Sequence, residues 1–220
     1  MIDRHIFHAL WTQWGHSLAW ELTPQQQDQL AHLYHLVMEG NRQQNLTRIT
    51  KIADFWEKHL WDSLFPLTAY FTQAGLRLID IGTGAGFPGL PLAVVCPSWQ
   101  VVLLDSRRKK TAFIDRAIHT LGLKNAQTVT DRAENYQING TGYDLAVIRA
   151  VGNLELCAQY SLPLLKPTGT AVLYRGHWTP EDELAVHQIC GSGQWHLSSL
   201  TAYVTPITHS QRHSLSLQKC

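Results

Sequence analysis

Residues 78–89 read LIDIGTGAGFPG, an apolar run that leads directly into a turn with glycines at positions 82, 84, 86 and 89. Glycine accepts backbone conformations that other residues rarely adopt, so such a turn can bend sharply at the end of a strand and approach a ligand closely. The helix expected after the turn presents unpaired N–H groups and the positive end of its dipole at the same place. The stretch therefore predicts a strand, a ligand-binding glycine loop and a helix, with a turn that binds nothing as the alternative.

Outward from this loop toward the C-terminus, short apolar runs alternate with helical patterns. Strands are expected at residues 76–81, 100–104, 125–130, 143–148 and 169–174, and helices over 109–121, 153–165 and after the Thr179-Pro180 cap. This alternation predicts a mostly parallel sheet covered by helices on both faces. Residues 194–205 and 212–218 alternate as antiparallel strands do, so a terminal hairpin should complete a seven-stranded sheet.

The residues before the first strand have helical periodicity. Helices are expected from Ile6 to Leu18, from the Thr23-Pro24 cap to Gly40, and over residues 52–70, where Pro66 should bend or end the last one. A polar loop is expected at residues 41–47. We therefore expect a helical N-terminal extension, residues 1–75, followed by an α/β domain, residues 76–220.

Composition and charge narrow the class of protein. Charged residues make up 16% of the chain, so a long disordered arm is not expected, and the net charge of +1 gives no strong overall attraction to nucleic acid or membrane. A local basic patch can still contact RNA. Apolar runs are too short to span a membrane, no signal peptide is evident, and the four cysteines have no zinc-ligand spacing. We expect a cytoplasmic monomer without metal, with buried structural thiols.

The glycine spacing alone leaves the cofactor open. Gly84, Gly86 and Gly89 match the dinucleotide fingerprint, which favours an NAD-dependent oxidoreductase. Asp80 favours S-adenosylmethionine (SAM), because a carboxylate two residues before the first glycine repels a pyrophosphate and suits the sulfonium and ammonium of SAM. The Asp-x-Gly-x-Gly-x-Gly phasing and the terminal antiparallel strands are also typical of SAM-dependent methyltransferases.

Three positions at later strand ends are candidate cofactor contacts. Asp105 lies about twenty residues past the loop, where a carboxylate accepts hydrogen bonds from ribose hydroxyls in both NAD and SAM proteins. Residues 131–134, which read DRAE, leave the third strand where an adenine would lie, unless they form a solvated turn. Arg149 offers a fork of donors to the methionine carboxylate or a substrate oxygen, with a surface ion pair as the alternative.

The residues that follow the fourth strand narrow the kinds of chemical group that could accept a methyl group. The sequence after this strand carries Arg149-Ala150 where enzymes that methylate exocyclic amines have an Asn/Asp-Pro-Pro-aromatic motif, and Cys157 falls inside the next helix. A ring nitrogen lone pair remains a reasonable target, and we nominate no general base. The basic run of residues 107–110 is either an RNA-facing patch or a solvated helix face. A non-catalytic RNA-binding module is another alternative.

His59 and Asp62 are three residues apart and should share a helix face. They either pair and brace the cofactor loop, touch substrate, or form a pair that only locks the helical segment onto the sheet. The tryptophans at positions 11, 14, 56 and 61 are expected in the core or an interface.

Several segments between Asn41 and Lys219 resemble the bacterial 16S rRNA (guanine-N7)-methyltransferase family, also called glucose-inhibited division protein B. They are Asn45-Leu46-Thr47, the HLWDS of residues 59–63, residues 80–92, Leu104-Asp105-Ser106, residues 131–134, Arg149-Ala150 and Arg212-His213. The His-x-x-Asp-Ser and Phe-Pro-Gly-Leu-Pro elements are much more selective for this family than the glycine loop. The chain departs from the family pattern in having Arg175-Gly176 in place of Lys-Gly.

The resemblance implies a Rossmann-like class I SAM methyltransferase that acts on a guanine N7 of 16S rRNA near the decoding site, in rRNA or the small ribosomal subunit. It also implies cofactor contacts at Gly82, Phe87, Asp105, Ser106, Arg107, Ala133, Glu134 and Arg149, beside Gly84, which the glycine spacing places near the cofactor. A methyltransferase acting on a different RNA or on a small molecule is the alternative.

Overall fold

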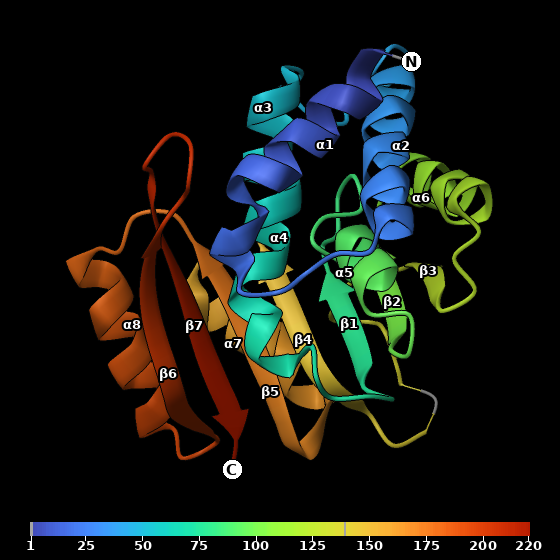
Figure 1. The fold of residues 1–220 in the computed structure, drawn as a ribbon. Coiled ribbons are helices and arrows are strands. Elements are labelled where there is room, and N and C mark those ends of the chain that lie inside the picture. Colours follow the sequence, from blue (N-terminus) through green and yellow to red (C-terminus); the bar gives the residue numbers. More distant parts are fainter. Residues whose placement is uncertain (1, 139) are drawn as a thin grey trace.

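The computed structural model describes residues 2–138 and 140–220. Within them the strands form one seven-stranded sheet in the order β3-β2-β1-β4-β5-β7-β6 (Figure 1). The strands are β1 (Arg77–Ile81), β2 (Gln100–Asp105), β3 (Ala126–Thr130), β4 (Tyr143–Arg149), β5 (Leu165–Arg175), β6 (Trp195–Val204) and β7 (Gln211–Lys219). The first five strands are parallel, and β7 is antiparallel to both β5 and β6. The expected mostly parallel sheet with a terminal antiparallel hairpin is confirmed.

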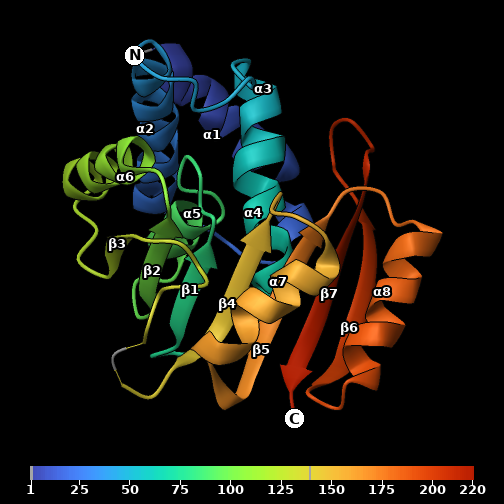
Figure 2. The ribbon, with the colours of Figure 1, turned by 180° about the vertical axis from the view of Figure 1, so that it is seen from behind.

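Helices cover both faces of the sheet because each buried strand alternates its side chains between two apolar cores. In β1, Leu78 belongs to the core that includes α5 (Gly89–Val95) and α6 (Arg108–Leu121). Its neighbour Ile79 belongs to the core that includes α7 (Leu154–Ser161) and α8 (Pro180–Gly191). Figures 1 and 2 show the two helical layers from opposite sides.

The chain before β1 is helical and packs into the α5–α6 core. Its elements are α1 (Ile2–Trp14), a 3-10 turn (Gly15–Leu18), α2 (Pro24–Asn41), α3 (Ile52–Phe55), a π-helix (Trp56–Trp61), α4 (Asp62–Leu64) and a 3-10 turn (Phe65–Tyr70). The expected cap of α2 is confirmed: Thr23 accepts from the N–H of Gln26, whose side chain accepts in return from the N–H of Thr23.

The helical segment expected over residues 52–70 is present and its regular turns end next to Pro66 as expected, but the segment is not α-helical throughout. The turns widen to a π-helix over Trp56–Trp61 and tighten to 3-10 from Phe65, next to Pro66, which has no N–H to donate to a regular helix. The helix expected over 153–165 ends at Ser161, and a 3-10 turn with Pro163 follows. β5 begins at Leu165, ahead of the expected Gly169, because Leu165 already pairs with Tyr143 across an irregularity in the register.

Burial of the aromatic and sulfur side chains follows the expectation in part. Trp11, Trp56 and Trp61 are buried, and Trp14 is half-buried. Cys96 and Cys157 are buried, whereas Cys190 is half-buried and Cys220 is exposed, so the expectation of four buried thiols is wrong for the last two.

No helix in the described part of the chain is long and apolar enough to cross a membrane.

A candidate cofactor crevice

A crevice of about 430 Å³ lies at the carboxyl ends of β1, β2, β3 and β4, where open α/β sheets bind their ligands. Six residues expected to contact a cofactor line it together: Gly82, Asp105, Ser106, Arg107, Ala133 and Glu134. Leu104, Val151 and Tyr160 add apolar and aromatic wall, which suits the flat face of a purine base. The sequence therefore brings together residues from three strand ends that are up to 52 positions apart.

The glycine loop is anchored to the neighbouring strand and needs glycine at two positions. The N–H groups of Gly82 and Thr83 donate to the carbonyl of Leu104 at 2.8 and 3.0 Å. Gly82 has a φ of +71°, and a Cβ there would lie 2.5 Å from Cγ2 of Val151 in the crevice wall. Gly84 has a φ of +63°, and a Cβ there would meet open space, with the nearest atom, the Gly82 carbonyl oxygen, at 3.9 Å. The loop backbone at Gly84 thus borders free volume.

Asp80 lies beneath this loop. Its Oδ2 accepts from the hydroxyl of Thr83 at 2.6 Å and from the N–H of Gly89 at 2.7 Å, while its Oδ1 is buried and has no hydrogen-bond partner among the described residues. Burial raises the pKa of Asp80 to about 6, against the lowering effect of those two hydrogen bonds. A Cβ at position 89 would lie 2.8 Å from Oδ2, so glycine at this position leaves room for the Asp80 carboxylate. The Asp80 carboxylate is not part of the crevice lining. Its negative charge can act on a group in the crevice only across the glycine loop that lies between them.

Asp105 connects the glycine loop to the turn that follows β2. Its Oδ2 accepts from the N–H of Gly84 at 2.9 Å, and its Oδ1 accepts from the N–H of Arg107 at 2.8 Å. Each carboxylate oxygen can accept two hydrogen bonds, so one remains on each for a further donor. The carboxylate is thereby fixed in orientation while it faces the crevice, as a ligand for two adjacent hydroxyls must be.

Three residues expected to contact the cofactor are not part of the crevice lining: Gly84, Phe87 and Arg149. The Arg149 guanidinium donates from Nη1 to the carbonyl of Lys58 at 3.0 Å and from Nη2 to Nδ1 of His59 at 3.3 Å. Nη1 also lies 3.6 Å from Oδ2 of Asp62. His59 and Asp62, expected to pair or share a role, both face Arg149, and no bond between the two is found in the described structure. These contacts hold the helical segment against the carboxyl end of β4. We call His59, Asp62 and Arg149 the clamp.

Phe87 joins this clamp to the glycine loop. Its ring stacks on His59 with centroids 4.5 Å apart and an interplanar angle of 13°, and the Arg149 guanidinium carbon lies 5.7 Å from its centroid. Nε2 of His59 lies 2.8 Å from the hydroxyl of Thr47. Because guanidinium only donates, Nδ1 accepts and the ring proton is on Nε2. Burial, and secondarily the charge of Arg149, lowers the pKa of His59 to about 3, so the ring is neutral.

Tyr203, on β6, is a contact that sequence reasoning missed. Its hydroxyl donates to Oδ1 of Asp62 at 3.2 Å, and Nε of Arg212 lies 3.7 Å from the same oxygen. Burial raises the pKa of Asp62, and the charges of Arg149 and Arg212 oppose that shift. No local signal marks Tyr203, because it reaches Asp62 across 141 positions of sequence.

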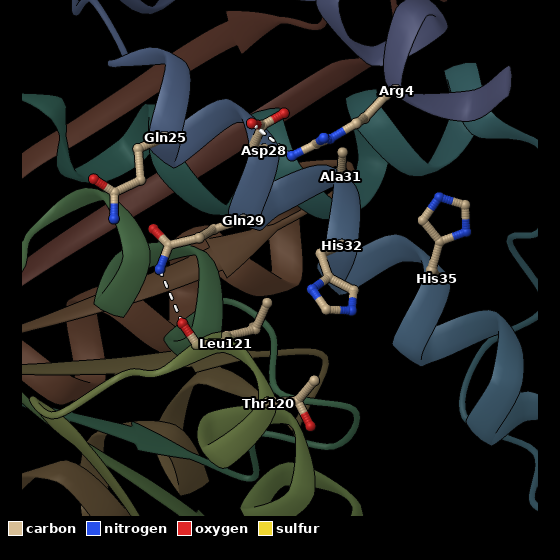
Figure 3. A pocket seen from close by; sticks show the side chains of 9 residues that line it. All are labelled: Arg4, Gln25, Asp28, Gln29, Ala31, His32, His35, Thr120 and Leu121. Atoms are coloured by element: carbon tan, nitrogen blue, oxygen red, sulfur yellow. Dashed lines mark hydrogen bonds and ion pairs between the residues drawn. The ribbon is translucent and has the colours of Figure 1, made fainter. Parts of the chain in front are cut away.

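A larger hollow, about 560 Å³, lies away from these groups between α2 and the end of α6 (Figure 3). Arg4 there pairs with Asp28 at 2.7 Å, and the side-chain amide of Gln29 donates to the carbonyl of Leu121 at 3.0 Å. These contacts join α1, α2 and α6. In the described residues, no group of three or more His, Cys, Asp or Glu side chains is placed to hold a metal ion. The residues expected to contact a cofactor gather at the crevice beside the glycine loop, and none of them lines this larger hollow.

Comparisons with known proteins also indicate a methyltransferase. A family model described as rRNA small subunit methyltransferase G matches residues 26–215. The protein of that name from Nostoc punctiforme is 46% identical over 213 residues, covering 94% of this chain and 87% of the relative. The one from Microcystis aeruginosa is 42% identical over 224 residues, covering 97% and 99%.

Solved structures share the fold at low sequence identity. A precorrin-6y C5,15-methyltransferase from Geobacter metallireducens matches with a TM-score of 0.57 at 15% identity, covering 80% of this chain and 92% of that one. A SAM-dependent methyltransferase from Aquifex aeolicus matches with a TM-score of 0.56 at 15% identity, covering 72% and 92%. The Rossmann-like methyltransferase fold expected from the sequence is confirmed.

Proposed function

The chain belongs to the GidB family of rRNA small subunit methyltransferases G, and from that premise we propose that it moves a methyl group from SAM to N7 of a guanine in 16S rRNA near the decoding site. The observation that carries the proposal is the position of Asp105, which faces the crevice while its two oxygens are held by Gly84 and Arg107. The family does not support the NAD-dependent alternative, whereas the ribose-binding position of Asp105 is common to NAD and SAM proteins.

The residues present fit SAM. Gly82 and Gly84 keep side chains out of the space beside the loop, and Asp105 has acceptor capacity left for two ribose hydroxyls. The buried, unpartnered Oδ1 of Asp80 provides negative potential beneath the loop, which suits a cation and disfavours a pyrophosphate. We propose cofactor contacts at Gly82, Gly84, Asp105, Ser106, Arg107, Ala133 and Glu134, with Phe87 and Arg149 supporting the loop from behind.

The proposal that guanine N7 is the methyl acceptor rests on the chemical state of two side chains, one a candidate base and one a candidate nucleophile. His59 is held as a neutral ring whose Nδ1 already accepts from Arg149, so it has no free lone pair with which to act as a base. The thiol of Cys157 is buried, donates to the carbonyl of Val151, and has its pKa raised by burial to about 11, so it is not available as a nucleophile. Guanine N7 carries a free lone pair and no proton at neutral pH, so its methylation needs neither.

When bound, SAM supplies an electrophilic methyl group on its sulfonium. The chain then contributes orientation and exclusion of water, which are sufficient for an in-line displacement by a lone pair. Asp105 and the glycine loop fix the donor, and the clamp of His59, Asp62 and Arg149 keeps the loop and the end of β4 in register. We further propose that the enzyme works in the cytoplasm as a monomer.

The test uses the chemistry of the product. N7 methylation fixes a positive charge on the purine, so after mild reduction the glycosidic bond becomes labile and aniline cleaves the RNA there. The protein and SAM are incubated with small ribosomal subunits, and separately with naked rRNA, from cells that lack this gene. We expect one new aniline-sensitive guanine near the decoding site.

Two results would contradict the proposal. Methyl incorporation without cleavage would place the methyl group on a different atom, and no incorporation into either substrate would remove rRNA as the acceptor. Asp105→Asn serves as the matched control, because it retains the side-chain shape and lacks the charge proposed to hold the donor.

A further inference from the structure

Exposed cations lie on two segments of the chain that contact each other, one of which directly follows the crevice residues Ser106 and Arg107. They are contributed by the segment between α2 and α3 and by the first turn of α6: Arg42, Arg48, Lys51, Arg108 and Lys109. We call these five residues the basic rim. We infer that the basic rim is the surface on which the phosphate backbone of the RNA next to the target nucleotide docks. This inference rests on the proposed function.

Ion pairing separates the rim from three arginines on the side of β4, β5 and β7. None of the five rim side chains forms an ion pair with a carboxylate among the side chains that the structure describes. On the other side, Arg149 and Arg212 both face Asp62, and Arg175 lies 2.6 Å from Asp182. The first turn of α8 is itself acidic. A polyanion is therefore attracted to the α6 side, although the net charge of the whole chain is only +1.

Two contacts join the parts of the rim and set them beside the cofactor loop. Nζ of Lys110 on α6 donates to the carbonyl of Asn45 at 3.0 Å. Two residues later the hydroxyl of Thr47 meets His59, which stacks on Phe87 of the loop. The segment between α2 and α3 therefore passes from α6 toward the glycine loop, and Figure 2 shows it at the end of the molecule where α2 and α3 meet. RNA bound along the rim would deliver a base to the crevice.

The first turn of α6 carries cations at the end of the helix where the helix dipole disfavours them. Arg108 and Lys109 lie at the positive end of the helix dipole, no acidic residue occupies that turn, and Arg107 provides no side-chain cap. Cations stabilise the opposite end of a helix. Helix stability therefore gives no reason for these charges, and a phosphate-binding role does.

The same helix provides a matched control. Arg116 and Lys124 are also exposed cations, but they lie farther along α6 and just past its end, toward the amino edge of the sheet. The test compares Arg108→Ala/Lys109→Ala with Arg116→Ala/Lys124→Ala, which lose the same charge. Arg48→Ala, added to the first pair, examines the other part of the rim. Binding to 16S rRNA is measured by filter retention over a range of salt concentrations, and SAM binding by calorimetry.

We expect the rim pair to weaken rRNA binding about tenfold at physiological salt and to lower the slope of log Kd against log salt by about 1.4, because each lost phosphate contact on single-stranded RNA removes about 0.7. Arg48→Ala should lower both further. SAM affinity should be unchanged, and Tm equal or higher, since the cations oppose the helix dipole. The control pair should bind rRNA like the wild type.

Wild-type rRNA affinity in the rim pair, or an equal loss in the control pair, would overturn the inference. The proposed function fails separately: if rRNA binding depends on the rim but no aniline-sensitive guanine appears, the docking surface stands and the acceptor atom does not.

Discussion

The guanidinium of Arg149 donates to Nδ1 of His59, at 3.3 Å, and so joins the end of β4 to the helical segment 90 positions earlier in the chain. The same ring stacks on Phe87 of the glycine loop. One imidazole thus contacts both the end of β4 and the glycine loop, and it does so only as the neutral tautomer that accepts at Nδ1. Protonation would place two cations against each other at this contact.

The first prediction is a pH dependence of stability that belongs to His59. Its pKa is about 3 in the folded chain and about 6.5 in the unfolded chain, so between these values the unfolded state binds more protons. The stabilisation is complete above pH 6.5 and decreases as the pH falls through that window. The free energy of unfolding of the wild type, relative to His59→Gln, should therefore drop by about 2 kcal/mol between pH 7.5 and pH 5.

Urea denaturation of the two proteins across this pH range measures the difference, in which all other titrating groups shared by both proteins cancel. A second measurement is the ¹⁵N spectrum of the His59 ring, which should show the Nε2–H tautomer at pH 6. A difference in stability that does not change with pH would contradict the neutral, buried ring.

The second prediction separates stability from binding at Asp80. Burial raises its pKa to about 6, so above that pH the folded chain holds an ionised carboxylate at a cost of up to roughly 3 kcal/mol. That cost appears as the pH rises from about 4 to 6 and stays constant above. Asp80→Asn removes the charge and retains an acceptor for Thr83 and Gly89. At pH 7.5 the variant should be at least as stable as the wild type and bind SAM at least tenfold more weakly.

Thermal unfolding and calorimetry with SAM measure the two quantities separately. If the variant lost stability and kept SAM affinity, Asp80 would serve the fold of the loop alone.

Much of the site was predictable because its signals are local. A strand followed by glycines places the loop at the carboxyl edge of the sheet, and the next strand end brings Asp105 to the same edge. Topology then requires residues 131–134 to lie beside them, since β3 pairs with β2 in parallel. These inferences need only the order of strands and helices and the direction of parallel strands.

The clamp was not predictable because it depends on contacts between distant segments. The spacing of His59 and Asp62 correctly put both on one face of the helical segment, yet their partner, Arg149, lies in another element. Arg149 as an expected cofactor contact shows the same limit: a strand-end position gives its edge of the sheet, and three neighbouring groups decide where its donors point. The π-helix over Trp56–Trp61 also changes the local turn, and no residue pattern indicated it.

The last prediction concerns Gly84, where a strained backbone and a ligand contact can be told apart. With a φ of +63°, any other residue at this position is strained, and a Cβ would project into open space beside the loop. Gly75 has a φ of +73° and no atom within 4 Å of its Cβ position, at a distance from the crevice along β1. Gly84→Ala and Gly75→Ala should therefore each cost about 1–2 kcal/mol of stability.

SAM binding should differ between the two variants. We expect at least a tenfold loss of affinity in Gly84→Ala, because the added methyl group would occupy the space that we assign to the cofactor, and no change in Gly75→Ala. Chemical denaturation gives the two stabilities and calorimetry the two affinities. Equal SAM affinity in both variants, with equal losses of stability, would mean that the open space beside Gly84 is not where the cofactor lies, and the crevice lined by Asp105 and Glu134 would have to hold it in a different orientation.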